Sequence, residues 1–380
     1  MEITEINDLK GLQALEPEWK ALLDNSYSAT FFQSPEWIIT WTKHFLDDRK
    51  LRVLVAREQG ELVGIAPLFM TLQREGVTNR TIKFLGDPLT DYNDYIIHND
   101  YVDKVLEGFC GHLHAHADEW NRLQLREMPG ESKTLAYIKK KHRASLPVKQ
   151  EETFRFRISE EDGSVGEIME RVEKKITERR GRLKKFIHSQ AYSAGLAKDY
   201  AEFLSFMERL KAFHIRRWAD TSTPSYFTDP KHVHFFEELH RLLWDRGMIN
   251  LSVVRRQGEV IATILCYLYQ DQCYYYTSSY SWEAKNISPS HANFLSTIGF
   301  CIERGFHTFD FGRGDESFKR EYANHICRNY SIDVVNKPVL MPLLKAKQLF
   351  LGSLRENPRL YRKAKQVKEF LGIMHKSTVG

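Results

Sequence analysis

An acidic turn with an arginine at its centre carries the clearest chemical pattern of the sequence. The block DFGRGDE, residues 310–316, follows a short predicted strand at residues 307–311. Carboxylates exchange protons with a reacting group when their pKa lies near the working pH, and the two glycines let the backbone pass close to a ligand. The catalytic candidates are Asp310, Asp315 and Glu316, and the candidates for holding an anionic group are Arg313 and Lys319. The alternative is a charged turn with internal salt bridges.

A second pattern predicts a helix start that binds an anion. Residues 288–292 read SPSHA and lie between a tyrosine-rich strand and the apolar-periodic segment 291–305. Serine suits the N-cap, proline suits the first helical position, and the free amides of the first turn attract phosphate. The candidate contacts are Ser288, Ser290, His291 and Ala292. The alternative is an ordinary helix cap.

Metal and covalent chemistry lack comparable patterns. The five cysteines form no CxxC pair, which favours neither a disulfide framework nor a zinc site. His112 and His116 share a helix face, but no third ligand is in view, so we expect a solvated face. No GxSxG or Cys–His pattern indicates a nucleophile. We therefore expect no metal and no covalent intermediate.

Composition indicates a globular protein of two or three domains, because 42% of the 380 residues are apolar and 28% are charged. Without a leader pattern or an apolar run of about 18 residues, we expect a cytoplasmic protein with no transmembrane segment. Nine Lys or Arg stand against two acidic residues in 341–380, and eight against two in 171–185. Solvated helix faces explain both clusters; an anionic ligand, a membrane surface or RNA is the alternative.

A weak internal repeat organises the rest of the chain. VLVAREQGEL at residues 53–62 matches LSVVRRQGEV at 251–260, and each has a further β-rich run behind it. The Gln-Gly pair predicts a tight β-hairpin turn. Phe32-x-x-Pro35 and Phe227-x-x-Pro230 precede the two hairpins, and the offsets of the two pairs, 195 and 198 residues, are nearly equal. This spacing favours a duplicated unit over two unrelated hairpins.

Periodicity and turn residues predict the elements that position these groups. Helices are predicted near residues 33–46, 101–118, 132–142, 164–184, 198–217, 231–246, 290–304 and 316–323, with two more at the C-terminus. Strands are predicted near 51–57, 61–70, 80–85, 122–128, 154–159, 186–193, 249–256, 260–269, 272–279, 307–311 and 328–335.

The order of a hairpin, a long third strand, a helix and a further strand resembles the C-terminal half of a GNAT acyltransferase domain. The whole chain resembles the bacterial GNAT subgroup with CelD-like cellulose-biosynthesis acetyltransferases and, more distantly, the FemAB-like transferases. The resemblance covers about residues 30–335. It rests on FFQSPEWIITWTKHF, REQGELVGIAPL, FLGDPLTDYNDYII, RRQGEVIATILCYLY, YYYTSSYSWEAKNISPS and, most specifically, FDFGRGDESFKREY.

The resemblance implies an α/β (α+β) fold of two tandem GNAT-like domains. Each domain would be a mixed, mostly antiparallel sheet flanked by helices. Residues 1–150 would form an N-terminal domain that walls the acceptor cleft without binding coenzyme A. Residues 151–340 would form the catalytic, acyl-CoA-binding domain, and 341–380 basic C-terminal helices.

The resemblance also implies direct transfer of an acyl group, most simply acetyl, from acyl-CoA to an amine of a small molecule or amino sugar. The strand residues Tyr276, Thr277 and Ser278 would pair with the donor arm, and Tyr322 would protonate the leaving thiolate. GNAT turns are usually glycine-rich, and Ser290 with His291 departs from that pattern. The expected acceptor contacts are Asp91, Tyr92, Asp94, His214, Arg217 and Trp218.

Two other functions fit the same residues. A FemAB-like transferase would take its group from aminoacyl-tRNA, with RNA contacts from residues 171–185 and the C-terminal RENPRLYRKAKQVKEF. A catalytically silent scaffold would keep the fold and dock on a membrane or polysaccharide complex through its basic end. DNA is not an expected partner, and the sequence defines neither the acceptor, nor the acyl chain length, nor the oligomeric state.

Overall fold

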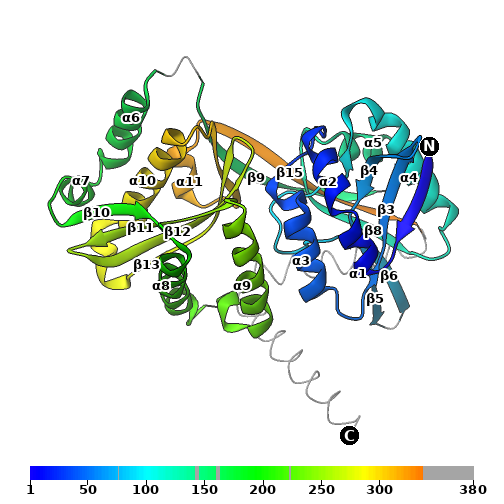
Figure 1. The fold of residues 1–380 in the computed structure, drawn as a ribbon, viewed down its shortest axis with the longest axis horizontal. Helices are drawn as coiled ribbons and strands as arrows, with labels where there is room; N and C mark the ends of the chain where they lie inside the picture. The colour runs from blue at the N-terminus through cyan, green and yellow to red at the C-terminus, as the bar shows by residue number, and fades with distance from the viewer. Residues whose placement is uncertain (76, 142–144, 160–162, 222–223, 337–380) are drawn as a thin grey trace, which may run out of the picture.

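The computed structural model of the protein describes residues 1–75, 77–141, 145–159, 163–221 and 224–336. Two lobes of mixed sheet and helix are joined by the long strands β9 and β15, and α3 and α9 pack against each other between the lobes (Figure 1). The basic helices expected at residues 341–380 lie outside the described residues. Within the described part, no helix is both long and apolar enough to cross a bilayer.

The N-terminal half supplies two sheets and their covering helices. Its elements are β1 (Glu2–Ile6), α1 (Leu9–Ala14), α2 (Glu16–Asp24), α3 (Pro35–Phe45), β2 (Lys50–Leu51), β3 (Val53–Glu58), β4 (Glu61–Ala66), β5 (Leu68–Glu75), β6 (Val77–Phe84), β7 (Ile96–Ile97), α4 (Val102–Ala115), β8 (Arg122–Pro129), α5 (Lys133–Lys141) and β9 (Ser145–Arg157). The first thirty residues, for which no element was predicted, contain β1, α1 and α2.

The C-terminal half ends, like the N-terminal half, with a helix, a strand, a short helix and a long strand. Its elements are α6 (Val165–Thr177), α7 (Gly181–Ile187), β10 (Tyr192–Leu196), α8 (Tyr200–Trp218), α9 (Pro230–Asp245), β11 (Ile249–Arg256), β12 (Glu259–Tyr269), β13 (Gln272–Tyr280), α10 (Pro289–Glu303), β14 (Thr308–Arg313), α11 (Ser317–Tyr322) and β15 (His325–Val335). The single helix predicted near 164–184 is two helices, and the strand predicted near 186–193 lies later, in β10.

The mixed, mostly antiparallel sheet flanked by helices is confirmed. One sheet of eleven strands runs in the order β10-β11-β12-β13-β14-β9-β15-β8-β6-β5-β2, and a second has the order β1-β3-β4-β7. Among the described strands, the pairs β13–β14 and β6–β8 are parallel and the other pairs are antiparallel.

The two halves exchange their last strands. β9 follows α5 of the N-terminal half but pairs with β14, with Arg157 opposite Thr308. β15 ends the C-terminal half but pairs with β8, with Val335 opposite Arg122. The boundary expected at residue 150 therefore falls inside β9. Because backbone ladders run from each half into the other, we infer that the halves are tightly coupled.

The two predicted hairpins have the same local geometry. Gln59 and Gly60 have φ of 52° and 90°, and Gln257 and Gly258 have φ of 51° and 87°. Two successive positive φ values define the turn that matches strand twist. A register shift falls one step before the arginine in both hairpins, at Ala56/Arg57 and Val254/Arg255. The structure thus extends the sequence repeat to backbone detail.

The Phe-x-x-Pro segments open the two helices that meet between the lobes. Pro35 and Pro230 each lie in the first turn of their helix, where a missing amide costs nothing. The preceding Ser34 accepts from the amide of Trp37, and Asp229 accepts from the amide of Lys231. A short 3₁₀ turn precedes each cap. The repeated sequence therefore encodes a repeated helix entry.

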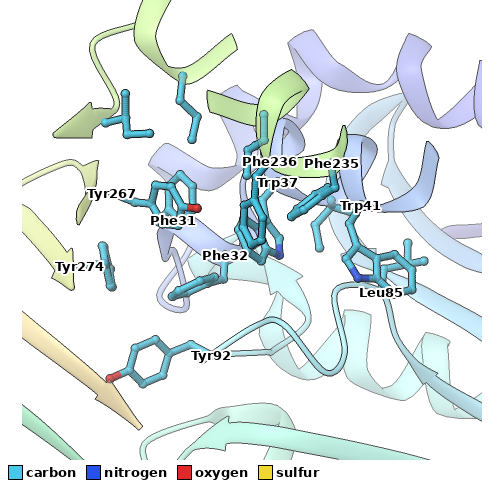
Figure 2. Packing of buried hydrophobic residues seen from close by; sticks show 14 of the residues in the cluster. Phe31, Phe32, Trp37, Trp41, Leu85, Tyr92, Phe235, Phe236, Tyr267 and Tyr274 are labelled. Carbon is cyan, nitrogen blue, oxygen red and sulfur yellow. The ribbon is translucent and has the colours of Figure 1, made fainter. Parts of the chain in front are cut away.

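Aromatic side chains from both halves form one shared core. Phe31 stacks on Tyr267 with ring centroids 4.3 Å apart, and Trp37 meets Phe235 edge-on at 5.5 Å (Figure 2). A second cluster joins Phe154 and Phe156 of β9 to the C-terminal half, and a third joins Ile332 and Val334 of β15 to the N-terminal half. Buried aromatic pairs add to the area term of the hydrophobic effect, so this core fixes the halves against each other and sets the geometry of the cleft beside it.

Candidate active site

A cavity of about 510 Å³ opens beside the end of β13. Its walls come from the end of α8, from β13, from the start of α10, from β14 and α11, and from one loop of the N-terminal half. The lining residues are Asp91, His214, Arg217, Trp218, Tyr275, Tyr276, Thr277, Ser278, Tyr280, Lys285, Ser288, Pro289, Ser290, His291, Phe294, Phe311, Arg313, Glu316, Phe318 and Lys319. The volume suits a small-molecule site.

The cavity exists because β13 and β14 separate. They pair only from Gln272–Tyr274 against Thr308–Asp310, and β13 continues to Tyr280 without a partner on that side. The predicted donor contacts Tyr276, Thr277 and Ser278 lie on this unpaired stretch and line the cavity. An unpaired strand edge offers amides and carbonyls to an extended ligand.

The start of α10 offers fewer amides than expected. Ser288 has the left-handed φ of 54° and its side chain does not cap the helix, which corrects the predicted serine cap. The amides of His291 and Ala292 both bond the carbonyl of Ser288, at 3.0 and 3.3 Å, and Pro289 has none. Only the amide of Ser290 is left to face an anion in this turn. Ala292 is buried and does not line the cavity.

Asp91 reaches this cavity from the N-terminal half. Its Oδ1 lies 3.0 Å from Arg313 Nε, and its carbonyl accepts from Asn329 at 2.7 Å. Burial raises the pKa of Asp91 to about 6, although Arg313 and Lys319 oppose the rise. A carboxyl group that titrates near neutrality within a cavity has the properties of a general base.

Gly312 gives Asp91 the space it occupies. A Cβ on Gly312, whose φ is +67°, would lie 2.2 Å from Asp91 Oδ2. Gly312→Ala is therefore expected to displace the carboxylate, to lower activity at least about tenfold, and to destabilise the fold by more than about 1 kcal/mol. Gly60→Ala is the matched control, because Gly60 has φ +90° with nothing within 4 Å of a Cβ. Equal activity losses in both variants, measured as kcat/KM, would contradict the role of this contact.

The two cations predicted to hold an anionic group already have protein partners. Arg313 contacts Asp91, donates to the carbonyl of Pro88 at 2.7 Å and lies 3.1 Å from Glu127. Lys319 donates to the carbonyl of Arg313 and lies 2.9 Å from Glu316. Both line the cavity, but this bonding favours a role in holding the loop around Asp91 over a role in anion binding.

Asp310 lies outside the cavity lining. Its side chain is fully buried, with Oδ2 2.8 Å from Arg155 Nε and Oδ1 accepting from Tyr92 at 2.7 Å and from the Gly312 amide at 2.7 Å. The predicted substrate contact Tyr92 is thus part of this buried network. A carboxylate with every partner inside the protein suits a structural link between the halves.

Tyr322 is also buried, and it reaches the cavity through a histidine. Its hydroxyl is 2.9 Å from Nδ1 of His291, and the two rings stack at 5.8 Å. Burial lowers the pKa of His291 to about 4 and raises that of Tyr322. His291 lines the cavity as a neutral ring. His214 lines it too, 2.7 Å from Ser225, and burial lowers its pKa to about 4.

Two further candidates do not reach the lining. Asp94 is buried in the N-terminal half, with 1% of its surface exposed, and accepts a hydrogen bond from the Tyr95 amide at 2.8 Å. Burial raises the pKa of Asp94 to about 6. Asp315 is exposed and does not line the cavity. Of the other predicted residues, Arg217 and Trp218 do line it. No cluster of three or more His, Cys, Asp or Glu that could hold a metal occurs in the described part.

Sequence reasoning missed Lys285 and Arg155. Lys285 lies in the 3₁₀ helix Trp282–Ile287 before α10 and lines the cavity, and its only sequence signal is its place beside the predicted anion site. Arg155 belongs to the segment FRFRIS, whose alternation puts the arginine on the opposite face from Phe154 and Phe156. That signal predicts a strand with one polar face but not the partner of that face.

Residues 173–320 match the sequence model of a family described as acetyltransferase (GNAT) domain. This segment has the GNAT fold. The matched segment contains β13, α10 and β14, which all line the cavity. The cavity therefore opens at the point in the matched domain where β13 and β14 separate. The CelD-like subgroup stays a prediction.

Solved structures resemble about nine tenths of the chain. FemX has a TM-score of 0.61 at 13% identity, over 90% of this chain and 99% of FemX. A conserved protein of unknown function from Bacteroides thetaiotaomicron VPI-5482 has a TM-score of 0.54 at 11% identity, over 88% and 99%. A tandem GNAT protein from the clavulanic acid biosynthesis pathway has a TM-score of 0.45 at 10% identity, over 89% and 99%. No curated protein matches the chain.

Proposed function

We propose that this GNAT-fold protein is an N-acyltransferase that moves an acyl group from a thioester or ester donor to an amine. The observation that carries the proposal is the cavity at the separated β13 and β14, where the α10 turn and the carboxylate of Asp91 line one space. The first wall belongs to the segment with the GNAT fold, and the second comes from the other half.

The residues support direct transfer. The amine nitrogen attacks the carbonyl carbon of the donor, its proton passes to Asp91, and the bond from carbon to the leaving sulfur or oxygen breaks. The leaving atom takes a proton from the His291–Tyr322 pair, in which His291 lines the cavity and Tyr322 lies behind it. Acid–base steps of this kind contribute about 10²–10⁴-fold each.

Acyl-CoA is the donor that the GNAT match favours, and acetyl-CoA is its simplest form. Aminoacyl-tRNA is the second candidate, and the sparse amides at α10 favour it, because a diphosphate would find little backbone support there. The acceptor we propose is a small amine or amino sugar. Calorimetry with acetyl-CoA, longer acyl-CoAs and an aminoacylated RNA minihelix separates the donors. Binding of none of them, with no release of thiol in the presence of amines, would overturn the proposed function.

Ser290→Glu tests whether the turn of α10 receives the donor's phosphate. The free amide of Ser290 and the positive end of the helix attract an anion, and a carboxylate at this position would occupy that site and repel phosphate. We expect the Kd for the donor to rise at least about tenfold. Ser205→Glu, on the exposed surface of α8, is the control for added charge. An unchanged Kd in Ser290→Glu would place the phosphate elsewhere.

A further inference from the structure

A second hollow shares two wall residues with the cavity. It has a volume of about 350 Å³ and is lined by Phe213, Arg216, Arg217, Asp220, Tyr280 and Trp282. Arg217 and Tyr280 line both spaces, so the two spaces are neighbours, and a ligand that passes these two side chains would occupy both. From Tyr274, the last residue of β13 that pairs with β14, to Tyr280 the strand spans about 20 Å. That length separates the reacting end of a ligand from a group in the hollow.

Trp282 gives the hollow an open aromatic face. Its side chain is 51% exposed, and it is the aromatic residue among the exposed large hydrophobic side chains of the described part. Lys285 Nζ lies 4.3 Å from the centroid of the Trp282 ring. An exposed indole costs free energy in water, and aromatic rings beside cations are the means by which proteins stack nucleobases next to phosphates.

Arg217 places a positive charge at the junction of the two spaces. Its guanidinium lies 5.7 Å from the ring centroid of Trp218 and 5.8 Å from that of Tyr280. The described structure gives it no carboxylate partner, whereas Arg216, which also lines the hollow, is paired with Glu283. Arg217 and Lys285 therefore have charge to offer a phosphate where the α10 turn has few amides.

From these observations we infer that the hollow is a nucleotide subsite, in which a purine base stacks on Trp282 while Arg217 and Lys285 hold phosphate. The inference rests on the proposed function, because the group in the hollow would be the nucleotide end of the acyl donor. Coenzyme A and the 3′ end of tRNA both carry adenosine with phosphate, so the shared ligand chemistry is an adenine nucleotide. In this arrangement the side chains of Arg217 and Lys285 bind the phosphate in place of the α10 amides, because those of His291 and Ala292 already bond the carbonyl of Ser288.

The first test uses adenosine 3′,5′-bisphosphate, which lacks any acyl arm, with the full chain. We expect saturable binding by calorimetry with quenching of tryptophan fluorescence, a Kd about tenfold or more higher in Trp282→Leu, and a Kd within about threefold of the native value in Trp282→Tyr. Arg217→Gln and Lys285→Gln should weaken binding and flatten its salt dependence. Arg241→Gln is the matched control, because Arg241 lies 4.5 Å from the Tyr200 ring centroid and lines neither space.

Competition experiments distinguish the two sources of the nucleotide, coenzyme A and tRNA, and further outcomes show which of the two proposals fails. Displacement of the probe by acetyl-CoA assigns the subsite to coenzyme A, and displacement by an RNA minihelix ending in CCA assigns it to tRNA. Equal binding of inorganic pyrophosphate, tighter binding of uridine 5′-diphosphate, or an unchanged Kd in Trp282→Leu would overturn the inference. A short acetyl thioester without a nucleotide distinguishes the two proposals. If Trp282→Leu impairs transfer from acetyl-CoA but not from the short thioester, both the nucleotide subsite and the proposed function are supported. If the bisphosphate probe binds but no acyl donor is used, the nucleotide subsite stands and only the proposed function fails.

Discussion

Asp91→Asn is expected to lower kcat/KM for acyl transfer by about 10²–10⁴-fold, because asparagine keeps the shape of the side chain but cannot accept the proton of the amine. The variant also keeps an oxygen for Arg313, which lies 3.0 Å from the native carboxylate. The loop should therefore stay in place. The measurement is the initial rate of thiol or RNA release with a fixed amine, across subsaturating donor concentrations.

The pH profile identifies the group. Burial raises the pKa of Asp91 to about 6, and a base must be deprotonated to act, so kcat/KM should rise with pH through about 6 and level off above it. Below that pH the protonated carboxyl group cannot accept a proton and the rate falls about tenfold per pH unit. This limb should be missing in Asp91→Asn.

Asp94→Asn is the matched control for this experiment. Asp94 lies three residues further along the same loop, and burial raises its pKa to about 6 as well, but it does not line the cavity. We expect its kcat/KM per folded molecule to stay within about threefold of the native value, with the acidic limb preserved. If Asp94→Asn removes the limb and Asp91→Asn keeps it, the assignment of the base is wrong.

The sequence reveals most where the signal is local. The Gln59-Gly60 and Gln257-Gly258 turns were predictable because two residues alone decide a hairpin turn. The helix entries at Pro35 and Pro230 follow equally from their immediate neighbours. The donor side of the cavity is also local, since β13 and the start of α10 are consecutive in the chain.

Strand pairing between segments that lie far apart in the chain could not be predicted from the sequence. The exchange of β9 and β15 pairs Arg157 with Thr308, which are separated by more than a hundred residues, and no local preference encodes that choice. The same exchange decides the surroundings of Asp310. Alternation places its side chain opposite Phe309 and Phe311, but only the arrival of β9 on that side makes the partner a buried arginine instead of a substrate.

The sequence also could not show which cations at the cavity are already paired with carboxylates. An arginine and a lysine beside a glycine-rich turn suggested anion binding, but Arg313 and Lys319 are bonded to Asp91, Glu316 and nearby carbonyls. Cations without such partners, Arg217 and Lys285, come from the end of α8 and from a 3₁₀ helix, which sequence patterns do not connect. Pairing within the fold, and not residue type, decides which cation is available to a ligand.

Asp310→Ala is expected to lower the free energy of unfolding by about 3–5 kcal/mol, because it leaves the guanidinium of Arg155 buried without its closest counter-charge. The carboxylate also accepts from Tyr92 and from the Gly312 amide, so its loss frees two more buried donors. Urea denaturation followed by tryptophan fluorescence measures the change. Glu238→Ala is the control, since the exposed pair of Glu238 with Lys43 should contribute no more than about 1 kcal/mol.

The same variant separates a structural carboxylate from a catalytic one. If Asp310 links the halves, Asp310→Asn should recover part of the lost stability, because an amide still accepts a hydrogen bond from Tyr92, and its kcat/KM per folded molecule should exceed that of Asp91→Asn. If instead Asp310→Asn is as stable as the native protein and its kcat/KM for acyl transfer falls about 10²-fold or more, Asp310 is the base, and its hydrogen bonds to Arg155 and Tyr92 do not set its role. We expect Asp310→Asn to have the higher kcat/KM of the two variants because the Asp310 carboxylate lies between Arg155 and Tyr92 and not in the cavity lining.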